Sequence, residues 1–149
     1  MRKIISNTSC LIVLDNIGLL YVLRELYGNI LVTEEVSQEF DKELEDWVLI
    51  QKIHDEKYFK VINAFIDKGE ASAIVLALET DNSILIIDDL KGRKIARNLG
   101  LSITGTLGVL LKAKQQGLIS SLKEVLDAFK DQGFRISSGL EREILKYDQ

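Results

Sequence analysis

Carboxylate and amide side chains are the residues of this sequence best suited to chemistry. The chain has one histidine, His54, which excludes a histidine-rich zinc site and disfavours a His-based triad. Any catalysis must therefore depend on carboxylates. The candidates that follow predicted strands or open predicted helices are Asn7, Glu39, Glu70, Asp88 and Asp89.

A cluster of such acids predicts a bound cation. Carboxylates that lie close together raise each other's pKa values, and a cation relieves that repulsion. Oxygen ligands without histidine or cysteine select a hard ion, Mg²⁺ or Mn²⁺. Such an ion activates water and stabilises the charge that develops on a phosphate under attack. The residue types therefore favour a metal-dependent phosphodiesterase.

Each candidate also has an ordinary structural explanation. A polar residue before an apolar helix is most often a helix cap, and a lone acid such as Glu39 is most often on a solvated helix face. Only the recurrence of these residues at one edge of a sheet favours a site. The candidate caps are Asn7, Thr8 or Ser9, Asp67 with Glu70 as a capping box, Asp89, and Thr104 or Thr106.

Short apolar segments predict the strands that would position these residues. The segment 84–87 lacks alternation, as expected for a strand buried on both faces. A segment at 47–50 could be a strand or part of a helix, and 134–136 could form an edge strand. The remaining predicted strands are 3–6, 101–104 and, more weakly, 29–32.

Helical patterns alternate with these strands. The alternation predicts an α/β fold with a mainly parallel sheet and helices on both faces. Ligands of such sheets bind beyond the carboxyl ends of the strands, where the candidate residues lie. The predicted helices are 11–26, as one or two helices broken near Gly18, 34–44 capped by Thr33, 70–79, 90–99, 105–116, 120–130 and 139–147.

Composition limits the class of protein. We expect the 149 residues to form one domain, 1–149, with one sizeable core. A net charge of −4 argues against a large nucleic-acid footprint but not against a small metal site that meets phosphates. Cys10 is expected to be a buried small hydrophobe in a reducing cytoplasm. We expect neither a signal peptide nor a membrane span.

Four segments resemble one family. In chain order they are "IISNTSCLI" (4–12), "VTEEVSQEF" (32–40), "DKGEASAIVLALE" (67–79) and the stretch 85–119, of which the last two are the most specific. They resemble the PIN-like domains, in particular a small prokaryotic branch similar to the toxin ribonucleases of toxin–antitoxin pairs. The resemblance implies a three-layer α/β/α fold and metal-dependent cleavage of RNA, with an antitoxin partner and a homodimer.

The resemblance also assigns roles by position. It implies that Asn7, Glu39, Glu70 and Asp88 bind Mg²⁺ or Mn²⁺, with Asp89 not separable from Asp88 by sequence. Hydroxyl residues have a supporting role in this interpretation, with Thr8 or Ser9 beside the first metal ligand, Asn7. The supporting residues are Thr8, Ser9, Thr104 and Thr106.

Asn7 departs from the family pattern, which often has Asp at this place. An amide oxygen can bind a metal but brings no negative charge, so we expect weaker metal binding. The alternative function is a weak or inactive PIN-like module that binds RNA or a protein partner. A response-regulator-like protein is disfavoured, because no lysine follows a fifth strand. Prolines usual near positions 10 and 33 are replaced by Cys10 and Thr33.

A basic cluster follows the Asp pair on the predicted helix 90–99. The ordinary interpretation is a solvated face, and the functional one is that Arg93 and Arg97 meet RNA phosphates. Gly105 and Gly108 flank the start of the next helix, where a phosphate could approach backbone N–H groups. The basic cluster comprises Lys91, Arg93, Lys94 and Arg97.

Overall fold

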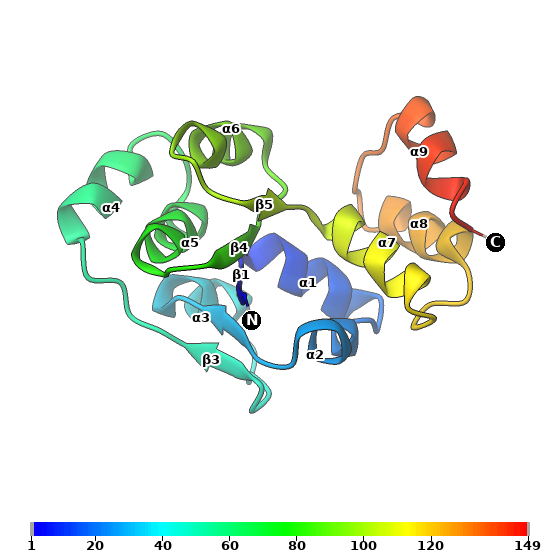
Figure 1. Ribbon diagram of the computed structural model, residues 1–149, viewed down its shortest axis with the longest axis horizontal. Coiled ribbons are helices and arrows are strands. Elements are labelled where there is room, and N and C mark those ends of the chain that lie inside the picture. Colours follow the sequence, from blue (N-terminus) through cyan, green and yellow to red (C-terminus); the bar gives the residue numbers. More distant parts are fainter. Residues whose placement is uncertain (1, 149) are drawn as a thin grey trace.

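A computed structural model describes residues 2–148 and contains one parallel sheet with the strand order β3-β2-β1-β4-β5 (Figure 1). The central strand β1 pairs with β4 from Lys3 opposite Ser83 to Ser6 opposite Ile86. All four strand pairings are parallel, as the sequence predicts. The strands are β1 (Lys3–Ser6), β2 (Ile30–Val32), β3 (Val48–Ile50), β4 (Ser83–Ile86) and β5 (Ile103–Thr104).

Helices connect these strands and extend beyond β5. Those after β5 lie at the opposite end of the molecule from α4 (Figure 1). Within residues 2–148, no helix has the length and apolar character needed to cross a bilayer. The helices are α1 (Thr8–Asn16), α2 (Tyr21–Tyr27), α3 (Glu34–Phe40), α4 (Glu56–Asn63), α5 (Lys68–Glu79), α6 (Leu90–Asn98), α7 (Thr106–Gln115), α8 (Leu122–Asp131) and α9 (Ser138–Leu145).

Alternation along β1 divides the core into two layers. Ile4 belongs to a cluster with residues of α1, α2, α7 and α8, whereas Ile5 belongs to a cluster with residues of α4, α5 and α6. Successive side chains of a strand point to opposite faces, so both faces of the sheet are covered. The predicted three-layer α/β/α fold is confirmed.

Four of the predicted caps are confirmed. Asn7, Thr33, Asp67 and Asp89 each accept a hydrogen bond from a backbone N–H in the first turn of the helix that follows. The prediction of a threonine cap for α7 is wrong. Its N-cap is Gly105, which has no side chain to offer, and the carboxylate of Asp88 reaches the α7 N-terminus instead.

Other predictions differ from the structure. Helix α3 ends at Phe40, not at 44, because Asp41 adopts a left-handed conformation with φ of 54°. For the 47–50 segment the structure decides between the two alternatives, because β3 is a strand. The segment 134–136 is not a strand, because Phe134 N bonds back to Phe129 O and the chain turns. Helix α4 was not predicted.

Candidate active site

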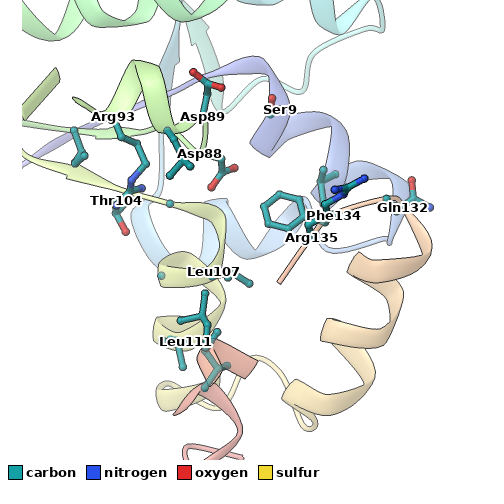
Figure 2. Close-up of a pocket in the computed structure, with 18 of the residues that line it drawn as sticks. Ser9, Asp88, Asp89, Arg93, Thr104, Leu107, Leu111, Gln132, Phe134 and Arg135 are labelled. Atoms are coloured by element: carbon teal, nitrogen blue, oxygen red, sulfur yellow. The ribbon is translucent and has the colours of Figure 1, made fainter. Parts of the chain in front are cut away.

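The carboxyl ends of the parallel strands bring the predicted residues to one edge of the sheet. Asn7 follows β1 directly, and Asp88 and Asp89 follow β4 after the buried Ile87. Glu70 lies in the first turn of α5. Figure 2 shows Asp88, Asp89 and Arg93 at this edge, where they line a cavity. The topology therefore places the candidates where ligands of α/β sheets bind.

Glu70 is the most perturbed acid at this edge. Burial raises its pKa to about 8, and the hydrogen bond and charge of Asp67 add to this, followed by the charges of Asp89 and Glu39. Its Oε2 atom is buried and has no hydrogen-bond partner among residues 2–148. An unpartnered carboxylate oxygen surrounded by other acids is an unfavourable arrangement that a bound cation would relieve.

Glu39 lies against the start of α5. Its Oε1 accepts a hydrogen bond of 2.5 Å from the hydroxyl of Thr8, the first residue of α1. A Cβ atom at Gly69 would overlap Oε1 of Glu39 and lie 2.9 Å from Thr8 Oγ1. The hydroxyl of Thr8 therefore orients the Glu39 carboxylate, and Gly69 makes the necessary space.

Asp88 is held by a single partner residue. Thr106 donates to it twice, from its backbone N to Oδ1 at 2.8 Å and from its Oγ1 to Oδ2 at 2.5 Å. These bonds cap α7 and fix the carboxylate.

The Cys10 thiol is fully buried near Thr106 and Asp88. Burial raises the pKa of this thiol to about 12, so it is unreactive.

Asn7 is almost completely buried. Its Oδ1 accepts from Cys10 N at 3.2 Å and caps α1, whereas its Nδ2 has no hydrogen-bond partner. Nearby, Thr33 Oγ1 and Ser72 Oγ share a buried hydrogen bond of 2.7 Å that joins the starts of α3 and α5. The neutral amide is therefore a buried helix cap and is not among the residues that line the cavity.

The remaining predicted residues separate into two groups. Asp89 caps α6 through Gly92 N, and Arg93 donates to Ile87 O at 2.8 Å, so both contribute to the wall of the cavity. Ser9 and Thr104 line the same cavity. Arg97 is exposed on α6 and is not among the lining residues, so the structure does not place it beside Arg93 in the cavity.

Three glycines that the sequence analysis did not connect with the acids each make room for one of them. A Cβ at Gly92 would lie 3.0 Å from Glu70 Oε2, and one at Gly105 would lie 2.9 Å from Asp88 Oδ1. Gly69 does the same for Glu39. The sequence signal was a glycine within two residues of a helix start; at Gly69 and Gly92, which lie inside their helices, alanine usually forms the better helix.

The cavity itself has a volume of about 890 Å³ and two chemically different ends. Glu70, Asp88 and Asp89 form an acidic end. The other end is apolar and is built from α7 and from the chain between α8 and α9, which Figure 2 shows with Phe134 and Arg135.

A comparison with known protein families identifies the family of the chain. The family model of the PIN domain matches residues 3–148. The chain belongs to the PIN-domain family. PIN domains have a nuclease-type fold and generally use divalent metals. No curated protein and no solved structure matched the chain.

The donors of this PIN domain suit a divalent metal in chemistry. The site offers carboxylate oxygens, one of them buried and unpartnered in Glu70. Within residues 2–148, no three His, Cys, Asp or Glu side chains already form a metal-holding group. Thr8 and Thr106 instead occupy oxygens of Glu39 and Asp88. The carboxylates fit a hard cation that replaces the hydrogen bonds donated by the hydroxyls of Thr8 and Thr106.

Proposed function

We propose that this PIN domain is a metal-dependent endoribonuclease that hydrolyses RNA phosphodiester bonds. The observation that carries the proposal is the buried, unpartnered Oε2 of Glu70, whose pKa is raised to about 8 beside Asp67, Asp89 and Glu39. Strongly perturbed acids in a cleft are typical of functional sites. The PIN-domain family supports a nuclease over other uses of an acidic cleft.

In this proposal Glu39, Glu70 and Asp88 hold one or two Mg²⁺ or Mn²⁺ ions, with the amide oxygen of Asn7 completing the set. When bound, the metal supplies an activated water and charge stabilisation at the phosphate. Asp89, next to Asp88, is the alternative acid at the same place.

Residues of the chain itself would orient the acids and the substrate. Thr8 and Thr106 fix the Glu39 and Asp88 carboxylates through the hydrogen bonds that they donate. The guanidinium of Arg93, held by Ile87 O, is placed to meet a phosphate oxygen at the acidic end of the cavity. Arg97 would act farther out on the exposed surface of α6.

The biological setting is part of the same proposal. The resemblance to toxin ribonucleases supports a role as the toxin of a toxin–antitoxin pair, as a cytoplasmic homodimer inhibited by an antitoxin protein. The family match over residues 3–148 supports a single PIN-like domain.

One set of observations favours a second function, a PIN-like module that binds RNA or a protein partner without cleaving. Asn7 brings no charge and uses its oxygen as a helix cap. Both oxygens of Asp88 already accept hydrogen bonds from Thr106. A site whose ligands are occupied in this way binds a metal weakly.

A cleavage assay separates the two functions. Purified protein is incubated with unstructured RNA in millimolar Mn²⁺ and in EDTA, with Glu70→Gln and Glu79→Gln as matched variants. Glu79 lies at the far end of α5, where it accepts backbone hydrogen bonds from His54 and Asp55. We expect cleavage only with Mn²⁺, lost in Glu70→Gln and kept in Glu79→Gln. RNA binding without metal-dependent cleavage would favour the second function.

A further inference from the structure

The cavity is larger than a metal site requires. Its volume of about 890 Å³ lies within the roughly 300–1,000 Å³ typical of sites for small organic ligands. Its acidic end, with Glu70 and Asp88, continues into an apolar end lined by Leu107, Leu111 and Phe134. A nucleotide has a similar division between a charged phosphodiester and a flat base, whose faces can stack on apolar side chains.

Phe134 is fixed in position at the apolar end. Gly133, with φ of +84°, turns the chain after α8, and Phe134 N then donates to Phe129 O at 3.1 Å. The two rings lie 5.0 Å apart between centroids at 45°, and Phe129 is fully buried. A partly exposed ring that is anchored on a buried one loses little conformational freedom when a ligand stacks on it.

Arg135, the next residue, provides a positive charge beside this ring. It is exposed and lines the same cavity, while Arg93 lines the acidic end (Figure 2). An RNA strand entering a cavity that contains three acids requires such cations near its phosphates. The two arginines therefore lie on the two sides of the space that a nucleotide would occupy.

We propose that Phe134 and Arg135 form a nucleotide subsite, in which Phe134 stacks on the base next to the phosphodiester at the acidic end and Arg135 contacts that nucleotide's phosphate. This inference rests on the proposed function, because it takes RNA as the substrate. Stacking on an aromatic ring tolerates any base, so the subsite selects an unpaired nucleotide, not a sequence. Paired RNA, whose bases are already stacked, is excluded from it.

The test measures binding in EDTA, where no metal-dependent cleavage occurs. The probes are a seven-nucleotide single-stranded RNA and a version of the same length in which every ribose is abasic. We expect the abasic RNA to bind the wild type more weakly than the intact RNA. Phe134→Leu should weaken binding of the intact RNA by about 5- to 150-fold and remove the difference between the two RNAs.

Three variants control the test. Phe134→Tyr keeps an aromatic ring and should bind like the wild type, and Arg135→Gln should weaken intact and abasic RNA alike. Phe65→Leu changes an exposed phenylalanine that does not line the cavity and should have no effect. Thermal melting checks that each variant is folded.

Equal RNA affinity of the wild type, Phe134→Leu and Arg135→Gln would overturn the subsite, even if the protein cleaves RNA with Mn²⁺. Phe134-dependent RNA binding without any metal-dependent cleavage would support the subsite and contradict the nuclease. Methyl signals of Leu107 and Leu111 that shift with an amphipathic helical peptide but not with the RNA would assign the apolar end to a protein segment and overturn it.

Discussion

Glu39 occupies the space that a side chain at position 69 would fill. Gly69 begins the turn of α5 that carries Glu70, and a Cβ atom there would overlap Oε1 of Glu39. Glycine at this position therefore links two acids that lie 31 residues apart in the sequence. An alanine at position 69 would displace the Glu39 carboxylate from its place against the start of α5.

Gly69→Ala tests this relationship directly. The exposed Glu39 side chain can swing away from the added methyl group, so the fold is expected to survive, with helix propensity favouring alanine by up to about 1 kcal/mol. Displacing one acid should weaken Mn²⁺ binding by about tenfold or more. Isothermal titration measures the affinity. Gly139→Ala in α9, where an added Cβ meets nothing within 4 Å, is the matched control. Mn²⁺ affinity equal in both variants and the wild type would contradict the account.

Asn7→Asp should strengthen metal binding at a cost in the metal-free protein. The new carboxylate can still cap α1 through Cys10 N, but it places an unpaired negative charge in a site that is only 1% exposed. We expect a lower melting temperature in EDTA, a larger rise on adding Mn²⁺, and an affinity about tenfold higher because ligand charge increases. Asn29→Asp, exposed before the amino end of β2, controls for added charge alone. An unchanged Mn²⁺ response would remove position 7 from the proposed ligand set.

Glu70 should give the metal-free protein a characteristic pH dependence. Its pKa rises from 4.5 to about 8 on folding, so between these values the folded state holds a proton that the unfolded chain releases. The free energy of unfolding therefore falls as pH rises from about 4.5 through about 8, by about 1–3 kcal/mol after solvent screening. Urea denaturation in EDTA at pH 5, 7 and 9 measures this slope.

Glu70→Gln is the control for that slope, because glutamine does not titrate. The variant should lose the fall in stability between pH 5 and 9, while the dependence caused by other groups remains. Mn²⁺ affinity of the wild type should increase from pH 6 to 8, since the metal binds the deprotonated carboxylate. Identical pH profiles of wild type and Glu70→Gln would show that this carboxyl is not perturbed.

Much of the fold could be predicted from local sequence. The strands at 3–6 and 84–87 are short runs of apolar residues, and Asn7, Thr33, Asp67 and Asp89 signal helix starts, so their elements were found within a few residues. Helix α4 was missed because it is a short amphipathic segment between polar residues. The segment 134–136 has a strand composition, but the turn at Gly133 returns it to α8.

The sequence indicates candidate site residues but not the interactions between them. Parallel topology explains why residues after β1 and β4 share an edge. The bonds from Thr8 to Glu39 and from Thr106 to Asp88 join distant segments, and no local pattern encodes them. The space beside each acid also depends on which helix packs against it, so the glycines could not be assigned from sequence.

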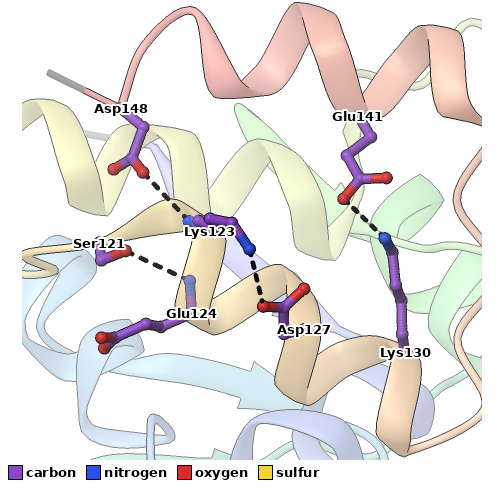
Figure 3. Close-up of polar contacts among 7 residues, drawn as sticks. All are labelled: Ser121, Lys123, Glu124, Asp127, Lys130, Glu141 and Asp148. Atoms are coloured by element: carbon purple, nitrogen blue, oxygen red, sulfur yellow. Dashed lines mark hydrogen bonds and ion pairs between the residues drawn. The ribbon is translucent and has the colours of Figure 1, made fainter.

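Asp148 should stabilise the end of the fold that carries Phe134. Its carboxylate accepts from Lys123 N at 3.2 Å (Figure 3). It also accepts from Leu122 N at 2.7 Å and pairs with Lys114 at 3.2 Å, so it caps α8. The bond from Leu122, more than the other contacts, lowers the pKa of Asp148. Its stabilisation is therefore present above an ordinary carboxyl pKa of 3.8 and is lost as pH falls through the lower folded value.

We expect Asp148→Asn to lower the urea midpoint at pH 7 and to matter progressively less toward pH 3. Asp127→Asn is the matched control, because Asp127 makes only an exposed pair with Lys123 on α8, at 3.3 Å. A smaller effect at position 148 than at position 127 would contradict the capping role.

The location of a bound metal tests the central claim most directly. Crystals grown with millimolar Mn²⁺ would be examined by anomalous scattering at the manganese edge. The account predicts a peak at the carboxyl edge of the sheet in contact with Glu70 and with at least one of Glu39 and Asp88, and no such peak in Glu70→Gln crystals. Manganese peaks confined to other parts of the surface, with none at Glu70 in the wild type, would contradict it.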